Sequence, residues 1–426
     1  MKHLNGSRRY LVAATLATAS IAMVGCGSDD DSKTSASTGA ASALGSPRAA
    51  TGSEVTIGYV SSGKGAATDT SSEIAASKAA VEYLNAYKGG IGGHKIKLEV
   101  CEDKFTPAGA ASCANQMLRD EVPVVLLGAS GQGGVVRERL AGKGPAVISD
   151  QAIDASAFAP TPGNFILTNA VSAAFAIPAQ TDKAKGIDHA AYIVNDVPAA
   201  TEGVNTVGKG YFAAAGVKLD VVPVPVGTAD VTPQIQSAIS KGAKAFHVVG
   251  ESNLCTAAFK ALQGLNFTGP ITGITQCFPG TPGEGLPKGA AGLTLEATGA
   301  SFRPKEGDAA MTRDFDLFDA VMDKYASGET KAGLAPLGYR VTMALGTVLE
   351  KETGDLTGAS VTKAFTSMST TRLPLGAGLS FNCNGKAFAL GKPFCTADGL
   401  EAPLDADGSI TKYEPVKVAL RLPAAG

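Results

Sequence analysis

The sequence predicts an α/β protein built from two doubly wound lobes joined by a multi-strand hinge. Its 426 residues exceed what one hydrophobic core usually serves, so two folding units are expected. Short apolar runs alternate with segments of helical periodicity in two successive series, which is typical of parallel sheets covered by helices on both faces. Apolar residues make up 44% of the chain and charged residues 18%, a balance that fits packed lobes and excludes a disordered chain.

The first series runs from residue 55 to residue 148. Each strand-like run in it is followed by apolar residues at helical spacing. Repeated units of this kind form a parallel sheet through right-handed crossovers. The expected strands are 55–60, 95–101, 123–127 and 145–148, and the expected helices are 73–87, 108–119 and 133–141.

The same alternation restarts near residue 190 and defines the second lobe. Its pattern again places one helix between successive strands, so a second parallel sheet is expected. The expected strands are 190–194, 217–226, 243–249 and 270–274, and the expected helices are 202–214, 231–240 and 254–262.

After residue 298 the sequence becomes mainly helical, with expected helices at 308–325, 335–353 and 358–367 and a last short strand at 416–420. We expect these helices to pack on the first lobe, so the chain would cross between the lobes more than twice. Such crossings act as hinges around a cleft. The expected lobes are residues 54–170 with 299–375, and residues 171–298 with 376–426.

The first 25 residues have the pattern of an export signal. Three positive charges precede the apolar run 10–24, which is too short for a comfortable membrane span. The run ends at Met23-Val24-Gly25-Cys26, which resembles the lipobox of bacterial lipoproteins. The resemblance implies that residues 1–25 are removed and that the Cys26 thiol carries lipid. The alternative is an ordinary signal peptide cut elsewhere, which would leave Cys26 as an exposed thiol without a role.

Residues 26–53 follow the export signal and are rich in Ser, Thr, Ala, Gly and Asp without an apolar period, as in a flexible tether. No later stretch approaches 18 uninterrupted apolar residues, so no second membrane crossing is expected. We therefore expect an exported protein whose lipid anchors it to the outer face of the cell membrane.

The six remaining cysteines lie as three neighbouring pairs along the chain. An even number of cysteines in an exported chain predicts disulfides, although six thiols allow 15 pairings. Zinc is the alternative, but no C-x-x-C occurs and the histidines stand alone, so no metal is expected. Nearest-neighbour bridges would join Cys101 to Cys113, Cys255 to Cys277, and Cys383 to Cys395.

Several phrases of the sequence resemble extracellular solute-binding proteins of the type I periplasmic-binding fold. They are the strand 55–58, the helix ending at Asn85, the glycine-rich 89–93 followed by 95–99, and the strand 123–128. By pattern the sequence is most similar to the leucine/isoleucine/valine-binding family, which delivers ligand to ABC importers. The resemblance implies a small-molecule solute and a membrane permease as partners.

The carboxyl ends of the first-lobe strands carry the candidate ligand residues. Ligands of open α/β sheets bind beyond these ends, and a hydroxyl followed by small residues at a helix start suits a carboxylate. The resemblance implies that the loops after the third and fourth strands hold the α-carboxylate of the ligand, which singles out Ser130 and Ala152. The alternative role for Ser130 is a helix N-cap. The first-lobe candidates are Ser62, Ser130, Gly131, Gln132, Asp150 and Ala152.

The corresponding second-lobe loops carry the candidates Glu251, Ser252 and Gln276. Here the sequence departs from the family, which usually places an acidic residue near Gln276 and tyrosines near Ala200 and Glu251. Glu251 or Asp150 could supply the negative charge for an ammonium group, but each could equally be a solvated loop carboxylate.

Other functional classes fit the sequence less well. The run 58–65 has Gly65 where a P-loop needs Ser or Thr, and 128–131 misses the G-x-S-x-G elbow by one position. The isolated histidines disfavour a hydrolase, and a net charge of −2 gives no basic surface for nucleic acid. We therefore expect no enzyme and no cofactor.

The expected function is capture of a small polar solute in the interlobe cleft and delivery to an ABC permease. A branched-chain or related amino acid is the favoured solute, and an amide or a short carboxylate is the alternative within this class. An exported hydrolase, or a surface protein whose cleft serves signalling or adhesion, is the alternative from a different class.

Overall fold

The computed structural model describes residues 42–65, 69–278, 280 and 282–420. The expected signal peptide, Cys26 and most of the expected tether lie outside these residues. The last part of the expected tether is hydrogen-bonded to the first lobe. The N–H of Arg48 donates to the carbonyl of Ala86 at 3.0 Å, and the N–H of Gly52 donates to the carbonyl of Gly93 at 3.1 Å. The folded body therefore includes residues that precede the first strand.

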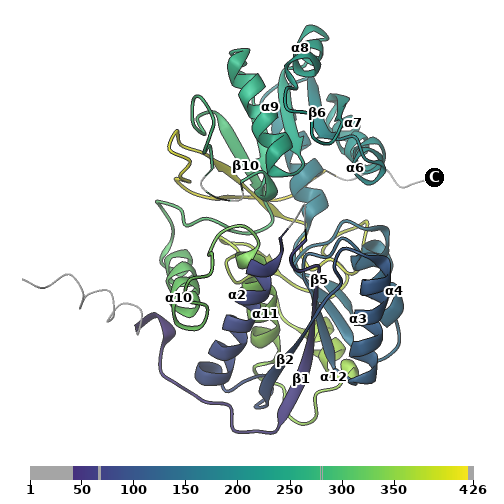
Figure 1. The fold of residues 1–426 in the computed structure, drawn as a ribbon, viewed down its shortest axis with the longest axis vertical. Coiled ribbons are helices and arrows are strands. Elements are labelled where there is room, and N and C mark those ends of the chain that lie inside the picture. Colours follow the sequence, from purple (N-terminus) through teal and green to yellow (C-terminus); the bar gives the residue numbers. More distant parts are fainter. Residues whose placement is uncertain (1–41, 66–68, 279, 281, 421–426) are drawn as a thin grey trace, which may run out of the picture. The chain divides into compact units, whose positions relative to one another are not determined.

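A five-stranded parallel sheet forms the first lobe (Figure 1). Its strand order is β2-β1-β3-β4-β5, so the chain starts in an inner strand and continues on both sides of it. The first four strands agree with the expected ones to within a residue or two, whereas β5 was not expected. The strands are β1 (Glu54–Ser61), β2 (Lys95–Glu102), β3 (Val124–Leu127), β4 (Ala146–Ser149) and β5 (Asn164–Ile166).

Helices cover both faces of this sheet, as the doubly wound prediction requires. Successive strand residues point to opposite faces, and Tyr59 and Val60 belong to different apolar clusters. The cluster of Tyr59 includes residues of α2, and that of Val60 includes residues of α3 and α4. The helices are α2 (Ser71–Tyr83), its π-helical continuation η1 (Leu84–Lys88), α3 (Pro107–Arg119) and α4 (Gly133–Leu140).

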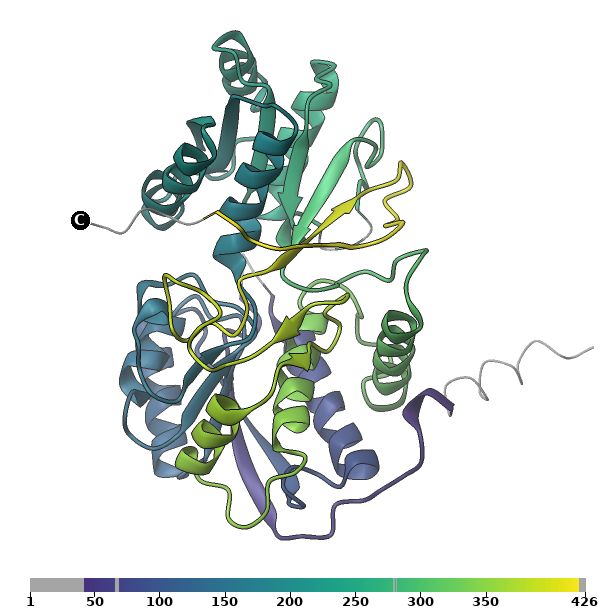
Figure 2. The same cartoon turned by 180° about the vertical axis from the view of Figure 1, so that it is seen from behind.

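A seven-stranded sheet forms the second lobe, in the order β14-β13-β10-β9-β8-β6-β7. Strands β6 to β10 are parallel, and β13 and β14 join antiparallel at one edge. Figure 2 shows these two late strands, in yellow, beside β10. The strands are β6 (His189–Asn195), β7 (Lys218–Val224), β8 (Ala245–Val249), β9 (Ile271–Ile274), β10 (Leu293–Ala297), β13 (Gly399–Pro403) and β14 (Glu414–Val416).

The second lobe differs from the prediction in two of its helical segments and in two of its strands. The expected helix 202–214 is interrupted by a π-helical turn, and a helical segment after β5 was not expected. Strand β10 was also missed, and the last strand, β14, ends at Val416, the first residue of the expected strand 416–420. The helices are η3 (Ser172–Ala176), α5 (Ile177–Ala184), α6 (Pro198–Gly203), η4 (Val204–Gly208), α7 (Lys209–Ala215), α8 (Thr232–Ser240), α9 (Ser252–Gly264) and η5 (Thr275–Cys277).

The three late helices return to the first lobe, as expected. Helices α10 (Ala309–Tyr325) and α11 (Ala335–Leu349) pack against α2, and α12 (Gly358–Ser367) packs against β4 (Figure 1). The chain then continues through a small ladder of β11 (Thr371–Arg372) and β12 (Ser380–Phe381) to the edge strands of the second sheet. It therefore passes between the sheets three times, which gives the multi-strand hinge.

The three neighbouring cysteine pairs form disulfides, which confirms that prediction. Cys101 of β2 is joined to Cys113 of α3, Cys255 of α9 to Cys277 of η5, and Cys383 to Cys395. The first bridge encloses the loop that follows β2, and the second joins two second-lobe segments that carry candidate ligand residues.

Candidate functional site

The carboxyl ends of β1 and β3 meet at the point where the strand order of the first sheet reverses. Ligands of open α/β sheets bind at such a switch point. The N–H of Ser62 donates to the carbonyl of Ala129 at 3.1 Å, and the N–H of Gly131 donates to Ser62 Oγ at 3.2 Å. The structure thus brings together Ser62, Ser130 and Gly131, which come from two loops.

The hydroxyl of Ser130 is held by two neighbours. It donates a hydrogen bond to Asp103 Oδ2 and accepts one from the N–H of Gln132 at 3.0 Å. Gln132 is the N-cap residue of α4, and no side chain caps that helix. The Ser130 hydroxyl therefore closes a local turn before the helix. The alternative role of Ser130 as a helix N-cap is therefore wrong, because the N-cap position of α4 is Gln132, and its contact with a ligand stays a prediction.

The backbone of this loop uses its N–H groups internally. The N–H of Ala129 donates to Glu73 Oε1 at 2.7 Å, and that of Gly133 donates to the carbonyl of Ser130 at 3.3 Å. Together with the bonds of Gly131 and Gln132, these bonds satisfy the N–H groups of four of the five loop residues 129–133. Most of the expected cradle of free N–H groups for a carboxylate is therefore used by the protein itself, with the Ser130 N–H as the exception in this loop.

Asp150, at the end of β4, is paired with an arginine from a distant helix. Arg340 of α11 is fully buried, and its Nη1 lies 2.9 Å from Asp150 Oδ2 and 3.2 Å from Oδ1. Burial raises the pKa of the Asp150 carboxyl, and the guanidinium opposes that rise. The carboxylate considered for a ligand ammonium is thus already neutralised by Arg340. Ala152, two residues further on, is buried.

Glu73, in the first turn of α2, is a site residue that the sequence did not reveal. Its side chain is almost completely buried and accepts hydrogen bonds from the Ser61 hydroxyl and the Ala129 N–H. Burial raises its pKa to about 7, although these hydrogen bonds act in the opposite direction. Gly128 is the sequence feature that is explained by this buried carboxyl group. A Cβ at position 128 would lie 2.6 Å from Glu73 Oε1, so a glycine is needed there.

Asp103, directly after β2, is the second residue that sequence reasoning missed. Its side chain is buried, and its Oδ1 accepts the N–H of Phe105 at 2.8 Å. The next two residues, Lys104 and Phe105, have φ values of 53° and 60°. Non-glycine residues rarely adopt this conformation, and such strain gathers at functional loops.

The second-lobe candidates lie at the carboxyl ends of β8 and β9. Glu251 is exposed and precedes α9 without capping it through its side chain. Ser252 lines a pocket with residues of α9 and of the segment after β9. Gln276 is exposed within η5, next to the Cys277 that is bonded to α9. The pocket is lined by Ser252, Thr256, Phe259, Cys277, Phe278, Gly280, Gly283, Glu284 and Leu286.

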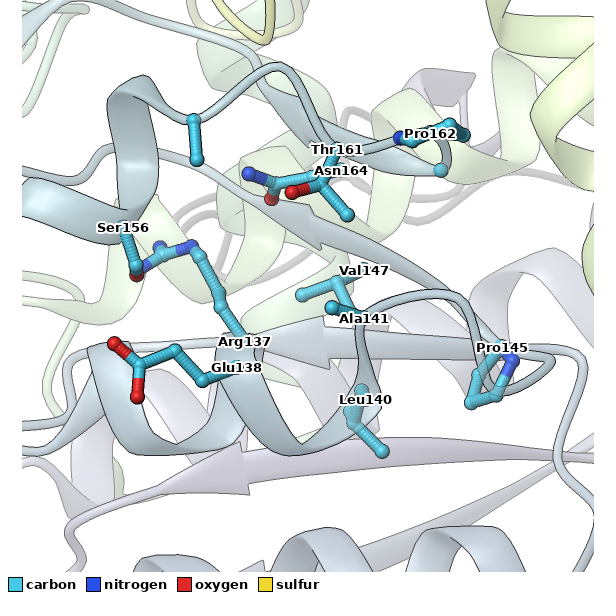
Figure 3. A pocket seen from close by; sticks show the side chains of 12 residues that line it. Arg137, Glu138, Leu140, Ala141, Pro145, Val147, Ser156, Thr161, Pro162 and Asn164 are labelled. Atoms are coloured by element: carbon cyan, nitrogen blue, oxygen red, sulfur yellow. The ribbon is translucent and has the colours of Figure 1, made fainter.

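A separate hollow lies on the outer side of the first lobe, between α4 and the starts of β4 and β5 (Figure 3). Arg137 borders it, and the figure shows this side chain reaching toward Ser156. The guanidinium is held by Asp154 at 2.5 Å and by Ser149 Oγ at 2.8 Å. None of the candidate ligand residues lines this hollow. Its lining is Arg137, Glu138, Leu140, Ala141, Pro145, Val147, Ser156, Ala159, Thr161, Pro162, Gly163 and Asn164.

Within the described part of the chain, no helix combines the length and apolar character needed to cross a membrane.

Many solved structures share this fold, among them the following three. The branched-chain amino acid transporter substrate-binding protein from Streptococcus pneumoniae, in complex with isoleucine, is 17% identical, with a TM-score of 0.65 over 85% of this chain and 99% of that chain. A possible leucine/isoleucine/valine-binding protein from Rhodopirellula baltica is 16% identical, with a TM-score of 0.66 over 88% and 99%. A fatty acid ABC transporter substrate-binding protein from Thermomonospora curvata is 15% identical, with a TM-score of 0.65 over 87% and 93%.

Identities this low establish the shared fold and leave the solute open. No curated protein matches the chain at a significant level. The sequence profile described as "Periplasmic binding protein", however, matches residues 54–389, which is most of the chain and includes the switch-point loops of both sheets. The chain therefore belongs to the periplasmic binding protein family.

Proposed function

We propose that this protein is an exported receptor that captures a small polar solute between its two lobes and delivers it to an ABC permease. Membership of the periplasmic binding protein family supports this proposal. The observation that carries it is the meeting of the Ser62 and Ser130 loops at the switch point of the first sheet. In this proposal the solute binds the first lobe, and second-lobe contacts made only on closure shift the population to the closed form.

Two kinds of solute are candidates. A branched-chain or related amino acid is favoured by the relatives named for such ligands. An amide or short carboxylate is the second candidate. Most N–H groups of the loop 129–133 are hydrogen-bonded within the protein. This favours an amide over a carboxylate as the solute group at the first lobe.

The proposed ligand contacts follow the sequence expectation, with one change of role. On the first lobe they include Ser62, Ser130 and Ala152, and on the second lobe Glu251. We place Asp150 behind the ligand, because Arg340 already neutralises it. The remaining proposed contacts are Gly131, Gln132, Ser252 and Gln276.

A panel of amino acids, amides and small acids tests this function by thermal shift and titration calorimetry. A solute present at 100 times its Kd should stabilise the protein by about 2.7 kcal/mol, and Tm should rise by several degrees. Ser130→Phe should abolish binding, whereas the same change at the exposed Ser112 of α3 should not. Stabilisation by no panel member would reject the transport function. Turnover of a hydrolysable compound, lost in Ser130→Phe, would identify an enzyme instead.

We also propose that Cys26 carries the lipid that holds the protein at the outer face of the membrane. The pattern at residues 23–26 supports this proposal. Mass spectrometry of the mature N-terminus should find a lipidated Cys26 and no residues before it. Cys26→Ser should release the protein from the membrane fraction; a variant that stays membrane-bound would contradict the anchor.

A further inference from the structure

The Ser130 hydroxyl has a fixed polarity in the switch-point loop. A hydroxyl has one donor and two acceptor sites. Its proton is directed to Asp103 Oδ2, and one of its lone pairs accepts the N–H of Gln132. What remains for a solute is one lone pair, so the Ser130 hydroxyl can accept a hydrogen bond but has no proton to donate.

Asp103 is held where it can impose this polarity. Its Oδ1 accepts the N–H of Phe105, and its own N–H donates to the carbonyl of Ser61 at 2.9 Å. The disulfide between Cys101 and Cys113 closes the chain around this loop. A buried side chain fixed from both flanks in this way does not turn to release Ser130.

Most backbone donors around the Ser130 hydroxyl are used inside the protein. The N–H groups of Ala129, Gly131, Gln132 and Gly133 all have partners inside the protein. A solute carboxylate, which can only accept, would be repelled by the Ser130 hydroxyl oxygen, and the Ser130 N–H and the Ser62 hydroxyl would be the donors left to it in these two loops. A solute N–H or O–H would find an acceptor in place.

We infer that Asp103 is a specificity-determining residue, and that the solute group meeting the Ser130 hydroxyl is an N–H or O–H donor, such as an amide, an ammonium or a hydroxyl. This inference rests on the proposed solute-binding function and names the chemical class of its ligand. It reverses the orientation expected from the sequence, in which these loops hold a carboxylate.

The first test uses the unaltered protein. The panel described above identifies a carbon skeleton that binds, and four compounds are then compared on that skeleton, with a carboxylate, a primary amide, an amine or an alcohol as the variable group. At least one donor compound should bind about tenfold to a hundredfold more tightly than the carboxylate, because a mispaired polar group costs that much. Tighter binding of the carboxylate would overturn the inference and leave the receptor function standing.

The second test turns the Ser130 hydroxyl around. In Asp103→Asn, the amide oxygen can still accept the N–H of Phe105, while the amide N–H₂ now donates to Ser130. The hydroxyl proton is then free to face the solute, and the preference for the donor compound over the carboxylate should shrink about tenfold. Asp120→Asn, at an exposed position after α3, is the matched control and should keep the original preference.

The outcomes separate the two proposals. If Asp103→Asn melts like the unaltered protein and keeps its preference, Asp103 does not set specificity. If it fails to fold, Ser130→Ala replaces it: loss of the acceptor should weaken the donor compound about tenfold and leave the carboxylate unchanged. An equal effect on both compounds would overturn the inference. Binding of no compound at all would remove the receptor function and this inference together.

Discussion

Glu73 is a residue whose burial conflicts with its chemistry, directly at the candidate site. A carboxylate out of water is costly unless hydrogen bonds and charges compensate it. Here Ser61 and the Ala129 N–H donate to it, while the Asp150 carboxylate repels it. Desolvation exceeds the compensation, so the pKa is raised to about 7. The residue is therefore half protonated near neutral pH, directly beneath the switch-point loop.

This raised pKa predicts that the protein loses stability as pH rises from about 4.5 to about 7. Over that range folded Glu73 keeps a proton that the unfolded chain releases, so ionisation favours unfolding. The loss of unfolding free energy is on the order of 3 kcal/mol. Glu73→Gln keeps an acceptor for the Ala129 N–H without titrating. It should make this part of the pH profile less steep, measured by urea unfolding, while buried Glu296, whose pKa is also raised by desolvation, contributes to the slope that remains.

The control is Glu82→Gln, at an exposed position on the same helix. It removes a solvated carboxylate and should leave the slope between pH 5 and 7 close to that of the unaltered protein. A Glu73→Gln variant that retained the full slope would show that another group is responsible.

At the scale of elements, the sequence patterns were informative where a strand or helix is regular and fully covered. Strand β1 and helix α3 were predicted to within two residues, since their apolar periods are clear. Strand β5 has only three residues, too few for a period of two to emerge. The π-helical turn η4 was missed because its extra residue per turn disturbs a 3.6-residue period only locally.

The contact between α11 and α2 depends on the absence of a side chain at Gly338. A Cβ at this position would lie 2.1 Å from the backbone oxygen of Glu73, and a backbone cannot rotate away as a side chain can. Gly338→Ala should therefore lower the unfolding free energy by about 3 kcal/mol. Gly264→Ala is the control. Gly264 is the last residue of α9, and a Cβ there would have no neighbouring atom within 4 Å. Alanine at this position should therefore be neutral or stabilising by up to about 1 kcal/mol. Urea unfolding distinguishes the two, and equal effects would argue against the close packing.

The disulfide between β2 and α3 should serve both stability and specificity. Replacing Cys101 and Cys113 by Ala should cost about 3 kcal/mol, because the unfolded chain gains freedom. It should also loosen the Asp103 loop and reduce the preference for a donor solute. The Cys383–Cys395 bridge has the same sequence separation of 12 residues but lies elsewhere in the chain. Its removal should therefore cost similar stability without changing that preference. If both double variants altered the preference equally, the effect would come from general destabilisation.

At the scale of the whole molecule, the candidate site was only partly predictable. The loops at the ends of β1 and β3 follow from topology, because parallel strands place their carboxyl ends at one edge. The partners of those loops do not follow from local sequence. Asp150 and Arg340 are 190 residues apart, and Ser130 and Asp103 come from different strand–helix units. A single sequence contains no pattern that relates such positions, so their pairing appears only in the folded chain.

Arg340 connects the first sheet to the chain segments that run between the sheets. Its guanidinium binds Asp150 at the end of β4, the carbonyl of Ala300 at 3.2 Å and the carbonyl of Pro374 at 3.2 Å. Ala300 lies on the segment that leaves β10, and Pro374 lies between α12 and β13. One buried cation thus joins two of the three chain segments that run between the sheets to the carboxyl end of β4 in the first lobe.

A double-mutant cycle on this pair tests whether it acts as a unit. Arg340→Met should cost about 3–5 kcal/mol, since it leaves the Asp150 carboxylate buried without a cation. Asp150→Asn should also destabilise, because it leaves the guanidinium uncompensated. Together the two changes remove both charges, so the double variant should be at least about 1 kcal/mol more stable than the sum of the single effects predicts. Urea unfolding of the four proteins at pH 7 measures this coupling. Additive effects would mean that Arg340 stabilises the passages through Ala300 and Pro374 alone.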